Sequence, residues 1–153
     1  MEQYLVTIDP TKTLAQMIEA GKYAHAHEAI NEKNFPLNPL AGNSDYRTPP
    51  TEVALELIRC ETTVTKEIET ILDLRGFRPA ILTELLALGA KYPELQKRPL
   101  VALGSSWVNP SGDRCIPYLG QGGGLRCLYL FLGADSSGVG WLGGHFRFVA
   151  VRK

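Results

Sequence analysis

The chain has 153 residues, of which 44% are hydrophobic, and its 16 basic side chains balance 16 acidic ones, so its formal net charge is zero. This length and apolar fraction fit one globular domain, and the zero net charge argues against a general nucleic-acid binder, which needs a basic excess. Because the chain has neither an apolar run of membrane-spanning length nor the basic and apolar start of a signal peptide, we expect no membrane insertion and a cytoplasmic or virion-associated protein.

A strand and a helix are expected first. Residues 4–8 are β-branched and apolar, which is typical of a strand. Thr11 or Thr13 can then cap a helix whose apolar residues recur at helical spacing and which ends near Gly21. Residues 36–50 are rich in Pro, Asn and Gly, which predicts a long loop.

A second strand and two further helices follow. Residues 53–58 have a strand pattern, and Thr63 or Thr65 opens a helix that stops at Gly76. Residues 77–79 are expected to be extended, because a residue before proline avoids the helical region. A third helix then begins before Leu82 and closes near Gly89 or Tyr92-Pro93.

The last third of the chain has the pattern of short strands joined by glycine-rich turns. Asn109-Pro110-Ser111-Gly112 is a turn sequence. The strands are expected at residues 100–107, 114–119, 125–132 and 146–151. Helices followed by a run of antiparallel strands predict an α+β fold, in which helices pack on short antiparallel strands with long loops between them. We expect residues 1–153 to form one domain.

Composition changes sharply at residue 98. Residues 98–152 contain no Lys, Glu or Met, and they hold 11 of the 15 glycines in the chain. Tight turns in a β region account for the glycines. They account less well for the loss of long polar side chains in strands that should alternate polar and apolar residues. The sequence therefore marks this segment as unusual in function as well as in structure.

Classical chemical motifs are absent. Gly120-Gln121-Gly122-Gly123-Gly124 lacks the Lys and the following helix of a phosphate-binding loop. The three cysteines, Cys60, Cys115 and Cys127, form neither a disulfide framework nor a CxxC motif. His25 and His27 are interpreted as polar surface residues. We expect no cofactor, no metal and no catalytic residue. An enzyme that uses Cys115 or Cys127 beside His145 is the alternative.

Three short motifs carry a resemblance to a known family. Gly76-Phe77-Arg78-Pro79-Ala80 leads into Thr83-Glu84, Leu103-Gly104-Ser105-Ser106-Trp107 follows, and Phe146-Arg147-Phe148-Val149-Ala150-Val151-Arg152 closes the chain. This pattern resembles the C-type lectin-like fold of the variable proteins of diversity-generating retroelements and, more distantly, that of the formylglycine-generating enzymes. The resemblance covers residues 76–153, with residues 1–75 as N-terminal strands and helices. The Glu-Pro-Asn and Trp-Asn-Asp motifs of calcium-dependent lectins do not occur.

The resemblance implies a non-enzymatic protein with a diversified ligand-binding surface in residues 105–145. In that family, AAC-type codons are randomised at their adenines, which cannot produce Lys, Glu, Gln, Met or Trp. Only Trp107, Gln121 and Trp141 within 105–145 belong to that excluded set. The implied partner is a protein or glycan. The implied surface residues are Ser106, Val108, Asn109, Ser111, Cys115, Tyr118, Gly122, Gly123, Cys127, Tyr129, Phe131, Ala134, Ser136, Ser137, Val139, Gly143 and His145.

The alternation of side chains along a strand predicts which of these residues point outward. In the strand over 125–132, the leucines at 128, 130 and 132 share one face and are expected in the core. Cys127, Tyr129 and Phe131 are then expected to point outward, together with Cys115 and the turn residues. The expected framework is Phe77, Leu85, Leu86, Trp107, Trp141, Phe146 and Phe148. Two alternatives remain: a small enzyme of the formylglycine-generating or cysteine-dependent kind, and a structural assembly subunit.

Overall fold

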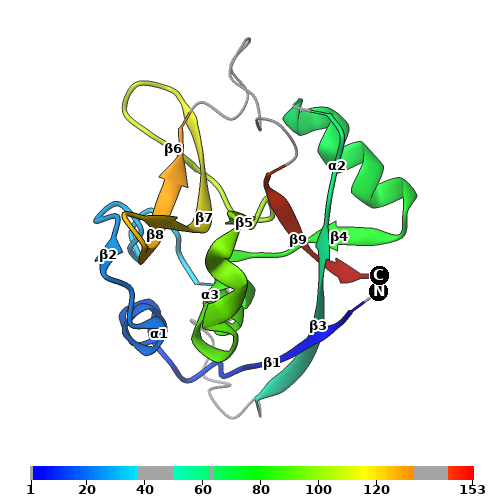
Figure 1. The fold of residues 1–153 in the computed structure, drawn as a ribbon. Coiled ribbons are helices and arrows are strands. Elements are labelled where there is room, and N and C mark those ends of the chain that lie inside the picture. Colours follow the sequence, from blue (N-terminus) through cyan, green and yellow to red (C-terminus); the bar gives the residue numbers. More distant parts are fainter. Residues whose placement is uncertain (1, 38–49, 63, 133–144) are drawn as a thin grey trace.

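A computed structural model describes residues 2–37, 50–62, 64–132 and 145–153 (Figure 1). These residues form an α+β protein with three α-helices, a short 3-10 helix and a nine-stranded mixed sheet that stays open. The predicted α+β class is therefore confirmed. None of the helices in the described part of the chain is long and apolar enough to cross a membrane.

The N-terminal elements follow the sequence pattern closely. Strand β1 spans Tyr4–Ile8, and helix α1 spans Leu14–Gly21. Thr13 caps α1 through a capping box, since its hydroxyl accepts from the Gln16 N–H while the Gln16 side chain accepts from the Thr13 N–H. Most of the loop expected at residues 36–50 lies outside the described residues.

The middle of the chain also agrees with the prediction. Strand β3 spans Thr51–Ile58, α2 spans Thr65–Leu74, β4 spans Phe77–Pro79 and α3 spans Leu82–Lys91. Gly76 ends the α2 segment with a φ of 82°, a conformation that favours glycine. Of the two predicted ends of α3, the one at Tyr92-Pro93 is confirmed, since the helix continues to Lys91 with Tyr92 as its C-cap, whereas Gly89 lies inside the helix.

The C-terminal strands are β5 (Leu100–Val101), β6 (Trp107–Val108), β7 (Arg114–Gly122), β8 (Leu125–Phe131) and β9 (Arg147–Arg152). The single strand expected at 100–107 is wrong, because the chain turns after Val101 and Gly104 packs against the backbone of Ala80. The sequence pattern also missed strand β2 (His25–Ala26) and the 3-10 helix η2 (Pro93–Lys97).

The sheet order interleaves the two halves of the chain. It runs β1-β3-β9-β5-β7-β8-β2, with β4 also paired to β9 and β6 to β7. The pairs β5–β9 and β2–β8 are parallel, whereas the other pairs are antiparallel. The strands are therefore not the simple antiparallel run that the sequence order predicted. The last strand instead lies at the centre, between strands from early and late in the chain.

Helices cover both faces of this sheet. On one face, which we call the α3 face, Leu14 of α1 and Leu85, Leu86 and Leu88 of α3 pack on buried sheet residues. On the other, the α2 face, Ile68 and Leu72 of α2 pack on the opposite side chains of the same strands. Figure 1 shows α1 and α3 together and α2 apart from them. Strand β9 is buried on both faces, which explains its continuous apolar run.

Candidate ligand-binding surface

The β7–β8 hairpin carries most of the predicted surface residues that the structure describes. Its register pairs Tyr118 with Tyr129, and Ile116 with Phe131. Even-numbered residues of β7 therefore share the α2 face with odd-numbered residues of β8. On the α3 face, Leu128 and Leu130 are buried in the core, as predicted.

Four aromatic rings gather on the α2 face of the hairpin. The ring centroids of Tyr118 and Tyr129 are 6.2 Å apart, those of Tyr118 and Phe146 are 6.4 Å apart, and those of Phe131 and Phe146 are 6.0 Å apart. All four side chains are half-buried. We call these residues the aromatic cluster. The sequence assigned Phe146 to the framework, so its place in this cluster was missed, although its position just before a core strand could have indicated it.

The two cysteines of the predicted surface are not exposed. Cys127 does lie on the α2 face, as alternation predicted, but it has no exposed area. The nearby Cys127 thiol is the largest cause that raises the pKa of the Tyr129 hydroxyl. Cys115 is also fully buried and belongs to the core on the α3 face. The prediction that it would join Tyr129 and Phe131 outside is wrong, because the register places odd-numbered residues of β7 on the other face.

The structure also corrects the prediction for Leu132. Strand β8 ends at Phe131, and Leu132 is 54% exposed rather than part of the leucine core face. The alternation argument fails there because the residue lies beyond the pairing with β7, whose first paired residue opposite β8 is Ile116.

The β6 loop places other predicted residues near the open end of the hairpin. Val108 pairs with Arg114 and is 62% exposed, and Ser106 and Ser111 are also exposed. Asn109 has a structural role, since its side-chain oxygen accepts from the N–H groups of Ser111 and Asp113 and so holds the turn. The predicted turn at 109–112 is confirmed, with Gly112 at a φ of 86°.

The remaining predicted positions lie elsewhere or are not described. Gly122 and Gly123 are exposed at the hairpin turn, six residue pairs along the ladder from Ile116–Phe131, a distance of about 20 Å at 3.3 Å per residue. The expectation of one continuous surface is therefore wrong for these two glycines. His145 is exposed beside Phe146. Ala134, Ser136, Ser137, Val139, Gly143 and the framework residue Trp141 lie outside the described residues.

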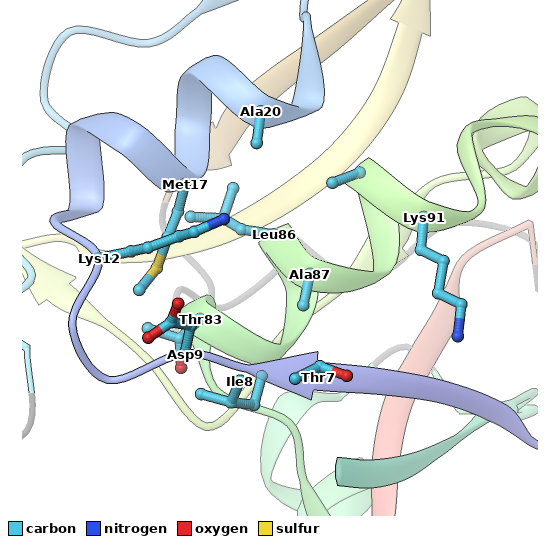
Figure 2. Close-up of a pocket in the computed structure, with 11 residues that line it drawn as sticks. Thr7, Ile8, Asp9, Lys12, Met17, Ala20, Thr83, Leu86, Ala87 and Lys91 are labelled. Atoms are coloured by element: carbon cyan, nitrogen blue, oxygen red, sulfur yellow. The ribbon is translucent and has the colours of Figure 1, made fainter. Parts of the chain in front are cut away.

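A cleft that the sequence did not indicate lies between β1, α1 and α3. One part encloses about 340 Å³ over Met17, Leu86 and Ala87, with Asp9 and Lys12 at its rim (Figure 2). An adjoining part of about 500 Å³ reaches Ser105 and Ser106. Ser106 thus borders the α3 side of the molecule rather than the aromatic cluster. The Asp9 carboxylate already accepts from the Thr11 N–H and hydroxyl, which lowers its pKa.

Cys115 and Cys127, the two candidate nucleophiles, are both hydrogen-bonded to backbone carbonyl groups. Cys115 and Cys127 lie on opposite faces of the hairpin, and their thiols donate to the carbonyl oxygens of Asp113 and Leu125. Burial raises the pKa of the Cys115 thiol, which is the reverse of what activates a nucleophilic cysteine. Among the described residues, no group of three or more His, Cys, Asp or Glu side chains could hold a metal ion.

Comparison with known protein families, with curated proteins and with solved structures finds no match to this chain. The site is therefore interpreted from its own geometry. What the structure itself shows is an α+β protein with an aromatic cluster on the α2 face of its β7–β8 hairpin.

Proposed function

We propose that this protein is a non-enzymatic binding protein of C-type lectin-like fold, and that it recognises a protein or glycan through the α2 face of the β7–β8 hairpin. The observation that carries the proposal is the aromatic cluster of Tyr118, Tyr129, Phe131 and Phe146. Tyrosine rings supply large contact areas at a small cost in conformational entropy, which suits them to ligand recognition.

The first family motif supports the proposed fold, because each of its main residues has a structural role here. Phe77 is buried in the core. Arg78 makes two hydrogen bonds, of 3.0 and 2.8 Å, with the two carboxylate oxygens of Glu84. Glu84 is 3% exposed, and its Oε1 also accepts from the Ile81 N–H at the start of α3. The motif thus ties β4 to the first turn of α3.

The second and third motifs support it in the same way. The Ser105 hydroxyl accepts from the Leu82 N–H at 2.7 Å, so the Ser-Ser-Trp segment is attached to the start of α3. A Cβ on Gly104 would come within 2.6 Å of the Ala80 oxygen, so only glycine fits there. The closing motif forms β9, the strand on which β3, β4 and β5 all pair. These contacts support the framework that the resemblance implies around the binding surface.

The proposed binding surface contains fewer residues than the whole segment 105–145. The exposed or half-buried residues of this face that carry the proposal are Val108, Tyr118, Tyr129, Phe131 and Phe146. Trp107 packs against the α3-face core, and Arg126 donates to the carbonyl oxygens of Gly21 in α1 and Gly89 in α3. We infer that diversification acts on the first set and spares the second.

The DNA around the gene tests this proposal. We expect a reverse transcriptase gene nearby and a near-repeat of the 3′ coding end that differs only at adenines. Across isolates, substitutions should concentrate at the codons for Val108, Tyr118, Tyr129 and Phe131. Substitutions spread evenly over these codons and those for Trp107, Arg126 and Leu128 would argue against a diversified binding surface.

A further inference from the structure

Three strands bring an arginine to the same edge of the sheet. Strand β3 runs antiparallel to β9 and pairs Ile58 with Phe148, while β5 runs parallel to β9 and pairs Leu100 with Arg147. The end of β3 and the beginnings of β9 and β5 therefore lie side by side, with neighbouring strands about 4.8 Å apart. Arg59 directly follows β3, Arg147 begins β9, and Arg98 lies two residues before β5.

The three arginines share one face of the sheet. Each arginine lies two residues from a side chain that packs in the α3-face core. These core residues are Leu57 for Arg59, Leu100 for Arg98 and Val149 for Arg147. Arg98 continues the extended backbone, with φ −117° and ψ 148°. The Arg147 N–H donates to the Pro99 oxygen at 2.9 Å, which holds the two strand beginnings together. Alternation therefore directs the side chains of Arg59, Arg98 and Arg147 to the α3 face, and we call them the arginine row.

Their charges are close enough to interact. Burial is the largest cause that lowers the pKa of the Arg147 guanidinium, and the charges of Arg98 and Arg59 lower it further. Like charges on neighbouring strands destabilise a sheet. Glu61 compensates the Arg59 charge only weakly, because its Oε1 lies 3.7 Å from the Arg59 Nε and both side chains are largely exposed. The row is a local concentration of positive charge in a chain whose net charge is zero.

We propose that the arginine row binds a tetrahedral oxyanion, the phosphate or sulfate group of a ligand. Guanidinium groups present planar pairs of N–H donors that match phosphate and sulfate oxygens. A doubly charged anion relieves the repulsion between three cations better than a single carboxylate does. One guanidinium is already oriented, since the Arg147 Nη1 donates to the Phe146 oxygen. The row lies on the opposite sheet face from the aromatic cluster, so this inference does not depend on the proposed function.

Calorimetric titration and thermal unfolding test the proposal with inorganic phosphate and inorganic sulfate as probes. Sodium chloride keeps the ionic strength constant. At ten times the dissociation constant, the unfolding temperature of the wild type should rise by about 3 to 6 °C. Arg98→Gln and Arg59→Gln should each weaken binding about tenfold or more, because each removes charged hydrogen bonds. Lys33→Gln, which removes the same charge from an exposed loop, is the control and should bind as the wild type does.

The variants also separate binding from a structural role. In chloride alone, Arg98→Gln should unfold at the wild-type temperature or above, because it removes repulsion within the row. Equal affinity for phosphate and sulfate indicates recognition of the shared tetrahedral shape, and preference for one identifies the group that the ligand carries. The proposal is overturned if neither anion shifts the unfolding temperature, or if Arg98→Gln and Lys33→Gln respond identically.

Discussion

At the scale of single residues, Arg126 shows how a polar side chain inside the predicted variable segment became part of the framework. Its Nη1 and Nη2 atoms donate to the carbonyl oxygens of Gly21 and Gly89 at 2.6 and 2.7 Å, and its Nε donates to Gln96. The Gly21 oxygen belongs to the last turn of α1, where a cation is favoured by the helix dipole. One side chain of β8 thus connects two helices to the sheet.

Replacing Arg126 should therefore be costly. We expect Arg126→Ala to lower the free energy of unfolding by about 3 kcal/mol, because charged hydrogen bonds are lost and the partner carbonyls stay poorly solvated. Arg126→Lys should also destabilise the protein, because the compact ammonium group of lysine cannot replace a planar guanidinium that bonds to three partners at once. Urea unfolding measures both. Lys33→Ala is the matched exposed control, and a loss at Arg126 no larger than at Lys33 would contradict the assignment.

Tyr23 is the neighbour of Arg126 and gives a pH-dependent prediction. Its ring lies 5.0 Å from the Arg126 guanidinium carbon, and its buried hydroxyl has no hydrogen-bond partner among the residues that the structure describes. Burial raises the pKa of Tyr23 to about 12. The folded protein then holds this proton more tightly than the unfolded chain, so the resulting stability is present below about pH 10 and is lost as the pH rises toward 12.

Tyr23→Phe tests this linkage. At pH 7 the variant should be as stable as the wild type or slightly more so, because it removes an unsatisfied buried hydroxyl and keeps the ring over Arg126. Between pH 10 and 12 the wild type should lose stability relative to the variant. Denaturant unfolding across this range gives the difference, and parallel curves for the two proteins would show that the Tyr23 proton is not linked to folding.

At the scale of elements, the β7–β8 hairpin separates a core face from a recognition face. Leu128→Ala should cost about 3 kcal/mol, since Leu128 is fully buried and the change leaves a cavity. Val108→Ala on β6 should change stability by less than about 0.5 kcal/mol, as is usual for exposed positions. Thermal or urea unfolding compares them directly. Similar losses at both positions would mean that the faces of this hairpin are wrongly assigned.

Strand β9 is the element on which the framework depends most. Phe148 is 2% exposed and belongs to the α2-face core, so Phe148→Ala should cost roughly 3 to 5 kcal/mol. Because β9 pairs with β3, β4 and β5, the loss should be global: circular dichroism and hydrogen exchange should report one cooperative change. If β9 alone opened while the other strands kept their protection from hydrogen exchange, the framework would not depend on β9.

At the scale of the whole molecule, the fold should depend on neither disulfides nor metals. Cys60, Cys115 and Cys127 are free and buried. Neither a reductant nor a chelator should lower the unfolding temperature, whereas loss of a native disulfide or a structural metal would lower it by about 10 °C or more. The three thiols should react with a thiol reagent slowly in the native protein and completely in denaturant. Fast reaction of one thiol in the native state would show that it is accessible.

The local elements of this protein can be predicted from patterns in its amino-acid sequence. Apolar periodicity predicted α1, α2 and most strands to within a few residues, and the cap of α1 at Thr13 and the turn at Gly76 likewise depend only on nearby residues. Alternation also separated Leu128 from Tyr129 correctly. These features could be predicted because the relevant interactions span only a few residues of chain.

The contacts between distant segments, by contrast, become visible only in the folded protein. The register of β7 on β8 placed Cys115 on the opposite face from Tyr129, and two-residue β2 forms only because β8 is beside it. Arg126, Gly21 and Gly89 are 37 to 105 residues apart in pairs, so no local pattern links them. The arginine row likewise arises only when the ends of three strands come together. Strand pairing over such separations is set by the packing of the whole core, which composition and periodicity do not encode.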